Sequence, residues 1–451
     1  MKYPFSAIQQ MNGGDGVAFC SDNLDNYNKQ KAIEEATRLY DINQHPIKDK
    51  TKKPDKKRVV LEEAIKDANG VPQPNPKTTF VKLERNPLDI SNYIIEQKTT
   101  LVTGAGVGLD SDDTESKLYK KVKLNWDNAK LEYDISQIFS TLKKETQVAL
   151  ILFGKKNGEF GYKIASPNRG DTMIPIYDEE TEDFIGFQRT FKLGEQEVTH
   201  LYYKDANELP RLKVIKDNQE ISDDALPYQN LPIIYWEQPE NECANVAELI
   251  YALEDGMNTF FDTARYFADP ILVAIGKSLN LPAQTDSGKV FNVQDEKGDM
   301  KFITPENPTE MRKLHFDMLE KYIFLLSHAV RLDAESLKGL GKSGLSGEAI
   351  ERLMTDAYMY ATNQQNGEFG KGVQRLVNFL TKEHATLTKD AEIMNIKAKF
   401  RKYSLRGEKE LVELYMQANG GLPVIGQEES IVQVGLAKDV NFNKQNTEKV
   451  V

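Results

Sequence analysis

The chain has 451 residues, which gives room for about three domains. Of these residues 39% are hydrophobic and 28% are charged, a composition typical of soluble proteins. No apolar run approaches the ~20 residues of a membrane span and the N-terminus lacks a signal-peptide pattern, so we expect a cytoplasmic chain with no membrane contact. The net charge of −11 argues against a protein that grips duplex DNA by neutralising its phosphates. The two cysteines and five histidines are scattered, so we expect neither a metal site nor a cofactor.

Residues 1–80 predict a loosely packed N-terminal arm and linker. Weak helical character around 27–40 is followed by a basic run over 48–58 and by prolines at 72, 74 and 76. We interpret the basic run as a solvated linker, because neighbouring like charges repel one another and keep the chain open. A contact between this run and nucleic acid is the alternative.

Residues 81–244 predict a domain of helices and antiparallel strands, which places the chain in the α+β class. The glycines at 104, 106 and 108 invite a dinucleotide-binding interpretation, but that fingerprint requires a glycine where Leu109 stands. Asn157-Gly158 between two apolar runs is a hairpin signal. We expect helices over 88–101 and 126–142, and strands over 148–153, 162–165, 173–177, 184–191, 198–203 and 212–215.

Two long helices with wide apolar faces are predicted on either side of a small β module. The first, over 245–268, ends at Asp269-Pro270, and the second follows Pro308 over 309–330. Within 269–308, strands are expected at 271–275, 290–294 and 300–304. Both faces are too apolar for the surface of a monomer, so we expect them to contact other subunits through Leu249, Leu253, Phe260, Met311, Met318, Tyr322 and Leu325.

A glycine-rich loop over 331–346 precedes a long helix over 347–392 and a helical, finally polar segment over 393–451. Gly341-Lys342-Ser343 matches the end of a phosphate-binding loop, but Ser336 stands where its first glycine is required. The segment before the loop also has helical periodicity, whereas such a loop should follow a buried strand. We therefore prefer a flexible loop whose Lys338 and Lys342 touch phosphates transiently, with a P-loop-like NTPase as the alternative.

This order of elements resembles that of the portal proteins, the head-to-tail connectors of tailed bacteriophages. The resemblance covers about residues 80–440 and includes a long helix that opens Ser346-Gly347-Glu348-Ala349-Ile350. It implies a wing (81–244), stem helices (245–268 and 309–330), a clip (269–308), a tunnel loop (331–346), a long wing helix (347–392) and a crown with a tail (393–451).

The resemblance also implies a function without catalysis. Subunits, usually twelve, would form a ring at one capsid vertex, the channel through which double-stranded DNA is packaged and ejected. The implied partners are the terminase large subunit, the major capsid or scaffold protein and head–tail adaptors, in a virion assembled in the bacterial cytoplasm. Another head-assembly or scaffold protein is the alternative. The implied DNA contacts in the tunnel loop are Arg331, Lys338, Gly339, Gly341, Lys342 and Ser343.

Overall fold

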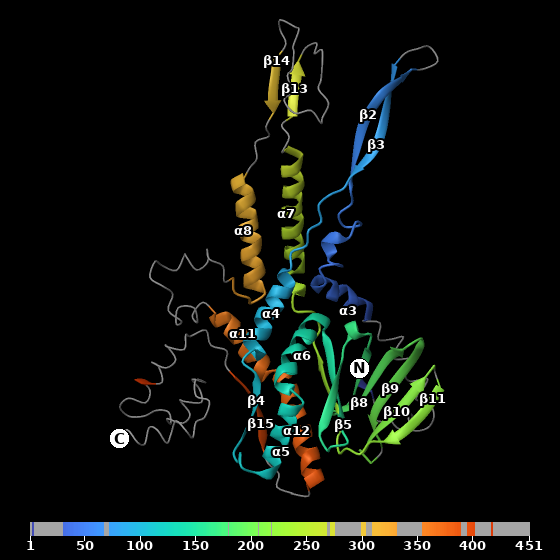
Figure 1. The fold of residues 1–451 in the computed structure, drawn as a ribbon, viewed down its shortest axis with the longest axis vertical. Coiled ribbons are helices and arrows are strands. Elements are labelled where there is room, and N and C mark those ends of the chain that lie inside the picture. The colour runs from blue at the N-terminus through green and yellow to red at the C-terminus, as the bar shows by residue number, and fades with distance from the viewer. Residues whose placement is uncertain are drawn as a thin grey trace. The chain divides into compact units, whose positions relative to one another are not determined.

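The fold is known from a computed structural model, which divides the chain into two compact units (Figure 1). Unit 1 comprises Met1–Ile33, Ile94–Asn241 and His328–Val451, and unit 2 comprises Glu34–Tyr93 and Glu242–Ser327. The described residues are 2–3, 30–66, 72–178, 180–205, 207–217, 219–267, 271–275, 299–303, 309–331, 354–388, 395–401 and 416–417. Within these residues, no helix has both the length and the hydrophobicity that crossing a membrane requires.

Unit 1 contains two sheets that share one apolar cluster. The larger has the strand order β1 (Lys2–Tyr3), β7 (Thr172–Asp178), β8 (Phe184–Leu193), β9 (Gln196–Lys204), β10 (Pro210–Lys216) and β11 (Gln219–Ala225). The smaller has the order β12 (Ile233–Glu237), β5 (Gln147–Gly154) and β6 (Phe160–Ala165). All neighbours are antiparallel except β1 and β7. Buried Phe187 and Tyr202 from the larger sheet pack with Ile151 and Tyr235 from the smaller one.

The helices of unit 1 surround a second apolar core, which also covers the two-stranded sheet of β4 (Val107–Ser111) and β15 (Ile396–Phe400). Trp126, Phe139 and Leu376 lie at its centre, each with no exposed surface. The strand β15 thus belongs to this core, although the resemblance assigned its residues to the crown. The helices are α4 (Ile90–Thr103), α5 (Lys117–Asn128), α6 (Leu131–Glu145), α11 (Thr355–Asn366) and α12 (Glu368–Thr388).

Two helices predicted as continuous are broken. The prediction over 126–142 is wrong at Ala129–Lys130, where Lys130 takes a left-handed backbone (φ 56°) that ends α5 and separates it from α6. The break leaves Trp126 in the last turn of α5, where its indole N–H donates a hydrogen bond to the Val107 carbonyl (3.1 Å). The long helix predicted over 347–392 is divided by Gly367, whose extended backbone (ψ −157°) separates α11 from α12.

Unit 2 is built on α7 (Ala247–Phe267) and α8 (Thr309–Leu326), which confirms the two predicted helices. Between them, β13 (Ile271–Ile275) pairs antiparallel with β14 (Asp299–Ile303), whereas the predicted strand 290–294 lies outside the described residues. The unit also includes much of α3 (Gln30–Thr37) and the first turn of α4.

The prediction of a loose arm over 1–80 is wrong for its second half. β2 (Lys56–Lys66) and β3 (Pro72–Val81) pair into a long antiparallel ribbon, hereafter the arm (Figure 1). The prolines at 72, 74 and 76 lie inside β3 and do not mark a break. Because they occupy alternate positions, their missing N–H groups fall on one edge of the strand, and a two-stranded ribbon leaves one edge of each strand unpaired.

The close packing of Gly372 in α12 against Trp236 can be tested by substitution. A Cβ atom added there would overlap the Trp236 indole, whose N–H donates to the Phe369 carbonyl (3.2 Å). Gly372→Ala should therefore destabilise the protein by about 1–3 kcal/mol, although alanine favours a helix by ~1 kcal/mol over glycine. Calorimetric unfolding would measure this loss, which should shrink in a Trp236→Phe background. A higher melting temperature for Gly372→Ala alone would contradict the packing described.

Candidate functional site

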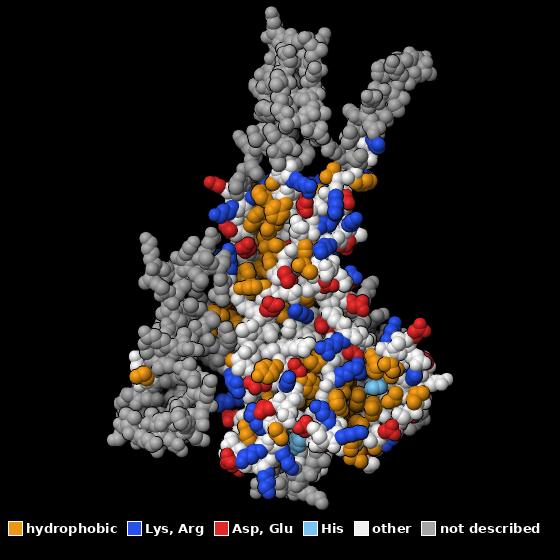
Figure 2. All heavy atoms as spheres, in the orientation of Figure 1, with side chains coloured by type: hydrophobic (Ala, Val, Ile, Leu, Met, Phe, Trp, Pro, Cys, Tyr) orange, Lys and Arg blue, Asp and Glu red, His pale blue; other side chains and the backbone are white. Residues whose placement is uncertain are grey.

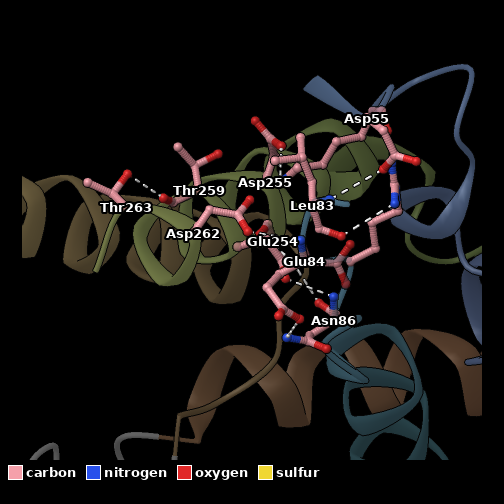
Figure 3. Close-up of polar contacts among 12 residues, drawn as sticks. Asp55, Leu83, Glu84, Asn86, Glu254, Asp255, Thr259, Asp262 and Thr263 are labelled. Carbon is pink, nitrogen blue, oxygen red and sulfur yellow. Dashed lines mark hydrogen bonds and ion pairs between the residues drawn. The ribbon is translucent and has the colours of Figure 1, made fainter. Parts of the chain in front are cut away.

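One face of α7 holds an extended segment, residues 84–88, through its main chain (Figure 3). Three side-chain oxygens on α7 each accept a backbone N–H, and we call this set the polar ladder. Successive rungs lie four residues apart on the helix, about 6 Å, and two residues apart on the extended segment, about 6.6 Å, so the two spacings match. The rungs are Glu254 with Leu88 (2.7 Å), Asn258 with Asn86 (2.8 Å) and Asp262 with Glu84 (3.0 Å).

Asn258 is the central rung and binds both the backbone N–H and the backbone carbonyl of Asn86. Its amide oxygen accepts the Asn86 N–H, and its amide nitrogen donates to the Asn86 carbonyl (2.9 Å) and to the Glu254 carbonyl (2.8 Å). Glu254 has no exposed surface, and its second carboxylate oxygen lies 3.2 Å from Nδ1 of buried His45. Burial of the Asn258 amide and of the Glu254 oxygen that accepts the Leu88 N–H is tolerable because both are hydrogen-bonded, whereas the close approach of Glu254 and His45 lacks hydrogen-bond geometry.

A second set of polar contacts fixes the base of the arm. The Arg85 guanidinium donates to the Lys53 carbonyl (2.6 Å) and to the Asp55 carboxylate (2.6 Å). Hydrogen bonds from Arg85 and from the Leu83 N–H hold the pKa of Asp55 below its usual range. Lys53 is 6% exposed and its ammonium lies 2.9 Å from Asp255. The solvated linker predicted over 48–58 is therefore wrong at Lys53, which is a buried anchor.

The opposite face of α7 packs against α8. Phe316 lies against Gly256, where a Cβ atom would come within 2.9 Å of the ring, and the Arg312 guanidinium lies 5.7 Å from the Phe260 ring centre. At about 100° per residue, this face is centred about 180° from the polar ladder. Helix α7 is thus held between segment 84–88 on one side and α8 on the other.

Helix α8 presents an exposed apolar row, hereafter the α8 stripe. Figure 2 shows hydrophobic side chains gathered over this pair of helices. The row is turned about a third of a turn away from the side that faces α7. Its members recur at helical spacing and are about half exposed or more: Met311 (72%), Leu314 (59%), Met318 (50%), Tyr322 (47%) and Leu325 (56%).

The predicted site residues thus fall into three groups. Met311, Met318, Tyr322 and Leu325 lie together in the α8 stripe. On α7, Leu253 is 1% exposed and therefore unavailable to another subunit, while Leu249 and Phe260 are half-buried. In the predicted loop, Arg331 is partly buried, whereas Lys338, Gly339, Gly341, Lys342 and Ser343 lie outside the described residues.

Sequence reasoning missed the polar ladder. Its signal was present, because Glu254, Asn258 and Asp262 place polar groups four residues apart on a helix otherwise rich in apolar residues. What the sequence could not give was the partner, which lies more than 160 residues away along the chain. Among the described residues, no group of three or more His, Cys, Asp or Glu side chains is placed to hold a metal ion.

Comparisons with known proteins relate this arrangement to phage particles. A family model described as "Phage portal protein, SPP1 Gp6-like" matches residues 23–444. One similar solved chain, from "Neck of empty GTA particle computed with C6 symmetry", has a TM-score of 0.42 and 10% identity over 78% of this chain and 90% of that chain. Another, from "Neck of native GTA particle computed with C12 symmetry", has a TM-score of 0.42 and 10% identity over 77% and 90%. No curated protein matches.

The polar ladder can be tested at its central rung. Asn258→Asp places a carboxylate oxygen where the amide donated to the Asn86 carbonyl, between the acidic rungs Glu254 and Asp262. We expect a loss of about 1–3 kcal/mol in unfolding free energy and faster hydrogen–deuterium exchange over 84–88. The control is Thr263→Ala, because within the described part of the chain the Thr263 hydroxyl donates only to the Thr259 carbonyl of the same helix. Unchanged exchange over 84–88 in Asn258→Asp would contradict the ladder.

Proposed function

The chain belongs to the SPP1 Gp6-like family of phage portal proteins, and we propose that it acts as one subunit of a closed ring that conducts double-stranded DNA. The family match extends over residues 23–444, which include all of unit 2 and most of unit 1. A portal protein stands at one vertex of the capsid. From that position we infer a channel, the packaging and ejection of DNA through it, and the partners of the ring.

The observation that carries the ring is the exposed α8 stripe. Five large apolar side chains in one row exceed what the surface of a monomer usually presents, and such rows mark contacts with other chains. A stripe that meets a different surface on the next copy makes a head-to-tail contact, which closes into a ring when the rotation between copies closes. We propose twelve copies, the number usual among the phage portal proteins that the chain resembles.

The parts of the subunit follow from this assignment. We propose α7 and α8 as the stem helices, the β13–β14 ribbon as part of the clip, and unit 1, apart from the tunnel loop and the crown, as the wing. The clip would meet the terminase large subunit during packaging and the head–tail adaptors later, while the wing would meet the capsid or scaffold protein. Residues 331–346 would form the tunnel loop, and a crown would follow residue 401.

We infer that the subunit itself carries out no catalysis. The NTPase alternative required a buried strand before the glycine-rich loop, because the phosphate-binding loop connects a strand to a helix. Residues 309–326 form the helix α8 instead. Energy for DNA movement would then come from the terminase, with the ring acting as its platform.

The ring can be tested by replacing apolar side chains of the stripe with charged ones. Met318→Glu with Leu325→Glu should yield subunits that sediment as monomers, since burying each apolar side chain contributes about 1.5–3 kcal/mol and every interface would lose two. Sedimentation velocity and negative-stain images would show the loss of rings. The matched control is Leu193→Glu, a 64% exposed leucine in unit 1, which should keep them. Normal rings from the double variant would remove the main support for the assembly.

The proposed DNA contact can be tested separately from assembly. Changing Lys338 and Lys342 to Glu should leave rings intact, because the stripe is untouched, but reduce the yield of filled heads by repelling DNA phosphates. Changing both to Arg retains the charge and serves as the control, with packaging near normal. Normal yields of full, infectious particles from the Glu variant would show that these lysines do not contact DNA.

A further inference from the structure

Unit 2 contains a cleft on the side of α7 that carries the polar ladder, hereafter the arm cleft. It lies between the base of the arm and the C-terminal end of α7, and has a volume of about 840 Å³. Val81 and Leu83 give it apolar walls, and Val81 is 42% exposed, next to Phe80 at 65%. An open hollow with an exposed apolar rim is a surface fitted to receive another chain.

The arm cleft and the α8 stripe lie on different sides of the same unit. The cleft wall is segment 83–84, which the ladder and Asp55 fix to one face of α7, while α8 packs on the opposite face. A head-to-tail contact requires two different surfaces facing different directions on each subunit. Unit 2 provides both, a protruding apolar helix and a receiving cleft.

The charges beside these two surfaces are complementary. Exposed Glu310 and Asp317 lie on one flank of the stripe, seven residues and so about 10 Å apart, with exposed Lys321 on the same flank. Exposed Lys56 and Lys82 line the arm cleft, together with Glu84, which pairs with Arg265, and with Asp262 of the polar ladder. Among the residues that the structure describes, the side chains of Glu310, Asp317, Lys56 and Lys82 make no ion pair or hydrogen bond. Two acids on one surface and two bases on the other, all four unpaired within the described residues, favour a contact between copies.

We propose that, in the ring, α8 of each subunit lies in the arm cleft of the next subunit. The stripe would cover Val81 and Phe80, and Glu310 and Asp317 would pair with Lys56 and Lys82. This inference rests on the proposed ring and adds the surface that receives the stripe. It also gives the arm and the polar ladder a function, because together they hold the wall of the receiving cleft.

Charge reversal tests the pairing without disturbing either core, since all four residues are exposed. One variant carries Glu310→Lys and Asp317→Lys, and the other carries Lys56→Glu and Lys82→Glu. Each alone sets like charges against each other at every interface, so the subunit concentration needed for rings in ~0.1 M salt should rise at least about tenfold. A control with the same charge change, Asp112→Lys with Glu115→Lys on unit 1, should assemble like the wild type.

Mixing the two variants should restore rings. In an alternating ring, the lysines on α8 of the first variant meet the glutamates in the cleft of the second, and the unchanged acids of the second meet the unchanged lysines of the first. The quadruple variant should likewise assemble alone. Sedimentation velocity and negative-stain images of the single variants, the mixture and the quadruple variant provide the readout.

The outcomes separate this inference from the ring itself. Rings from both single variants at wild-type concentrations would overturn the pairing, as would a failure of both the mixture and the quadruple variant to assemble. If the wild type forms rings that the stripe variant loses, the proposed function stands whatever the charge variants show. If the wild type forms no rings, the proposed function fails first.

Discussion

Unit 2 depends on the polar ladder of α7. The rise of four helical residues nearly equals the rise of two extended residues, so a helix with polar groups at every fourth position can follow a strand rung by rung. Glu254, Asn258 and Asp262 use this match to bind the main chain of residues 84–88. All three N–H donors belong to the main chain. These contacts therefore require particular side chains on α7, but not on the segment that α7 binds.

The ladder leaves α7 with two faces of different chemistry. Its polar face binds segment 84–88 within the subunit and places Glu254 3.2 Å from His45, and its opposite face is filled by α8 through Gly256 and Phe316. Much of the apolar surface that this helix pair leaves exposed therefore lies on α8, in the stripe about a third of a turn from the side that faces α7. In the proposed ring, assembly would bury that surface, so the stability of this region would be tied to subunit concentration.

Local patterns in the sequence were sufficient for much of the fold. Apolar residues at helical spacing identified α7 and α8, and alternation identified most strands of unit 1, because both signals arise from the burial of one face. β11 was missed because its sequence, with Glu220, Asp223 and Asp224, has no apolar alternation. The arm was missed because its prolines suggested a break, although proline is tolerated at the unpaired edge of a strand.

The site was predictable on one helix and hidden on the other. The α8 stripe follows from spacing alone, and four of its residues were predicted and are exposed together. On α7, the same spacing rule placed Leu253 at a subunit contact, yet it is buried within unit 2. Periodicity shows which face of a helix is apolar, but it does not show whether that face meets the same chain or another copy, since both kinds of burial favour the same residues.

The spacing of the stripe also explains why an interface built on it needs charge. Its members at 311, 314, 318, 322 and 325 nearly superimpose on one another when the helix slides by one turn, so apolar contact alone leaves the register open. Glu310 and Asp317 would remove this ambiguity, because a slide of one turn carries both about 5.4 Å away from fixed partners. Exposed charges contribute little affinity and much selectivity. In a closed ring this division matters, because a slip at one interface would prevent closure at all the others.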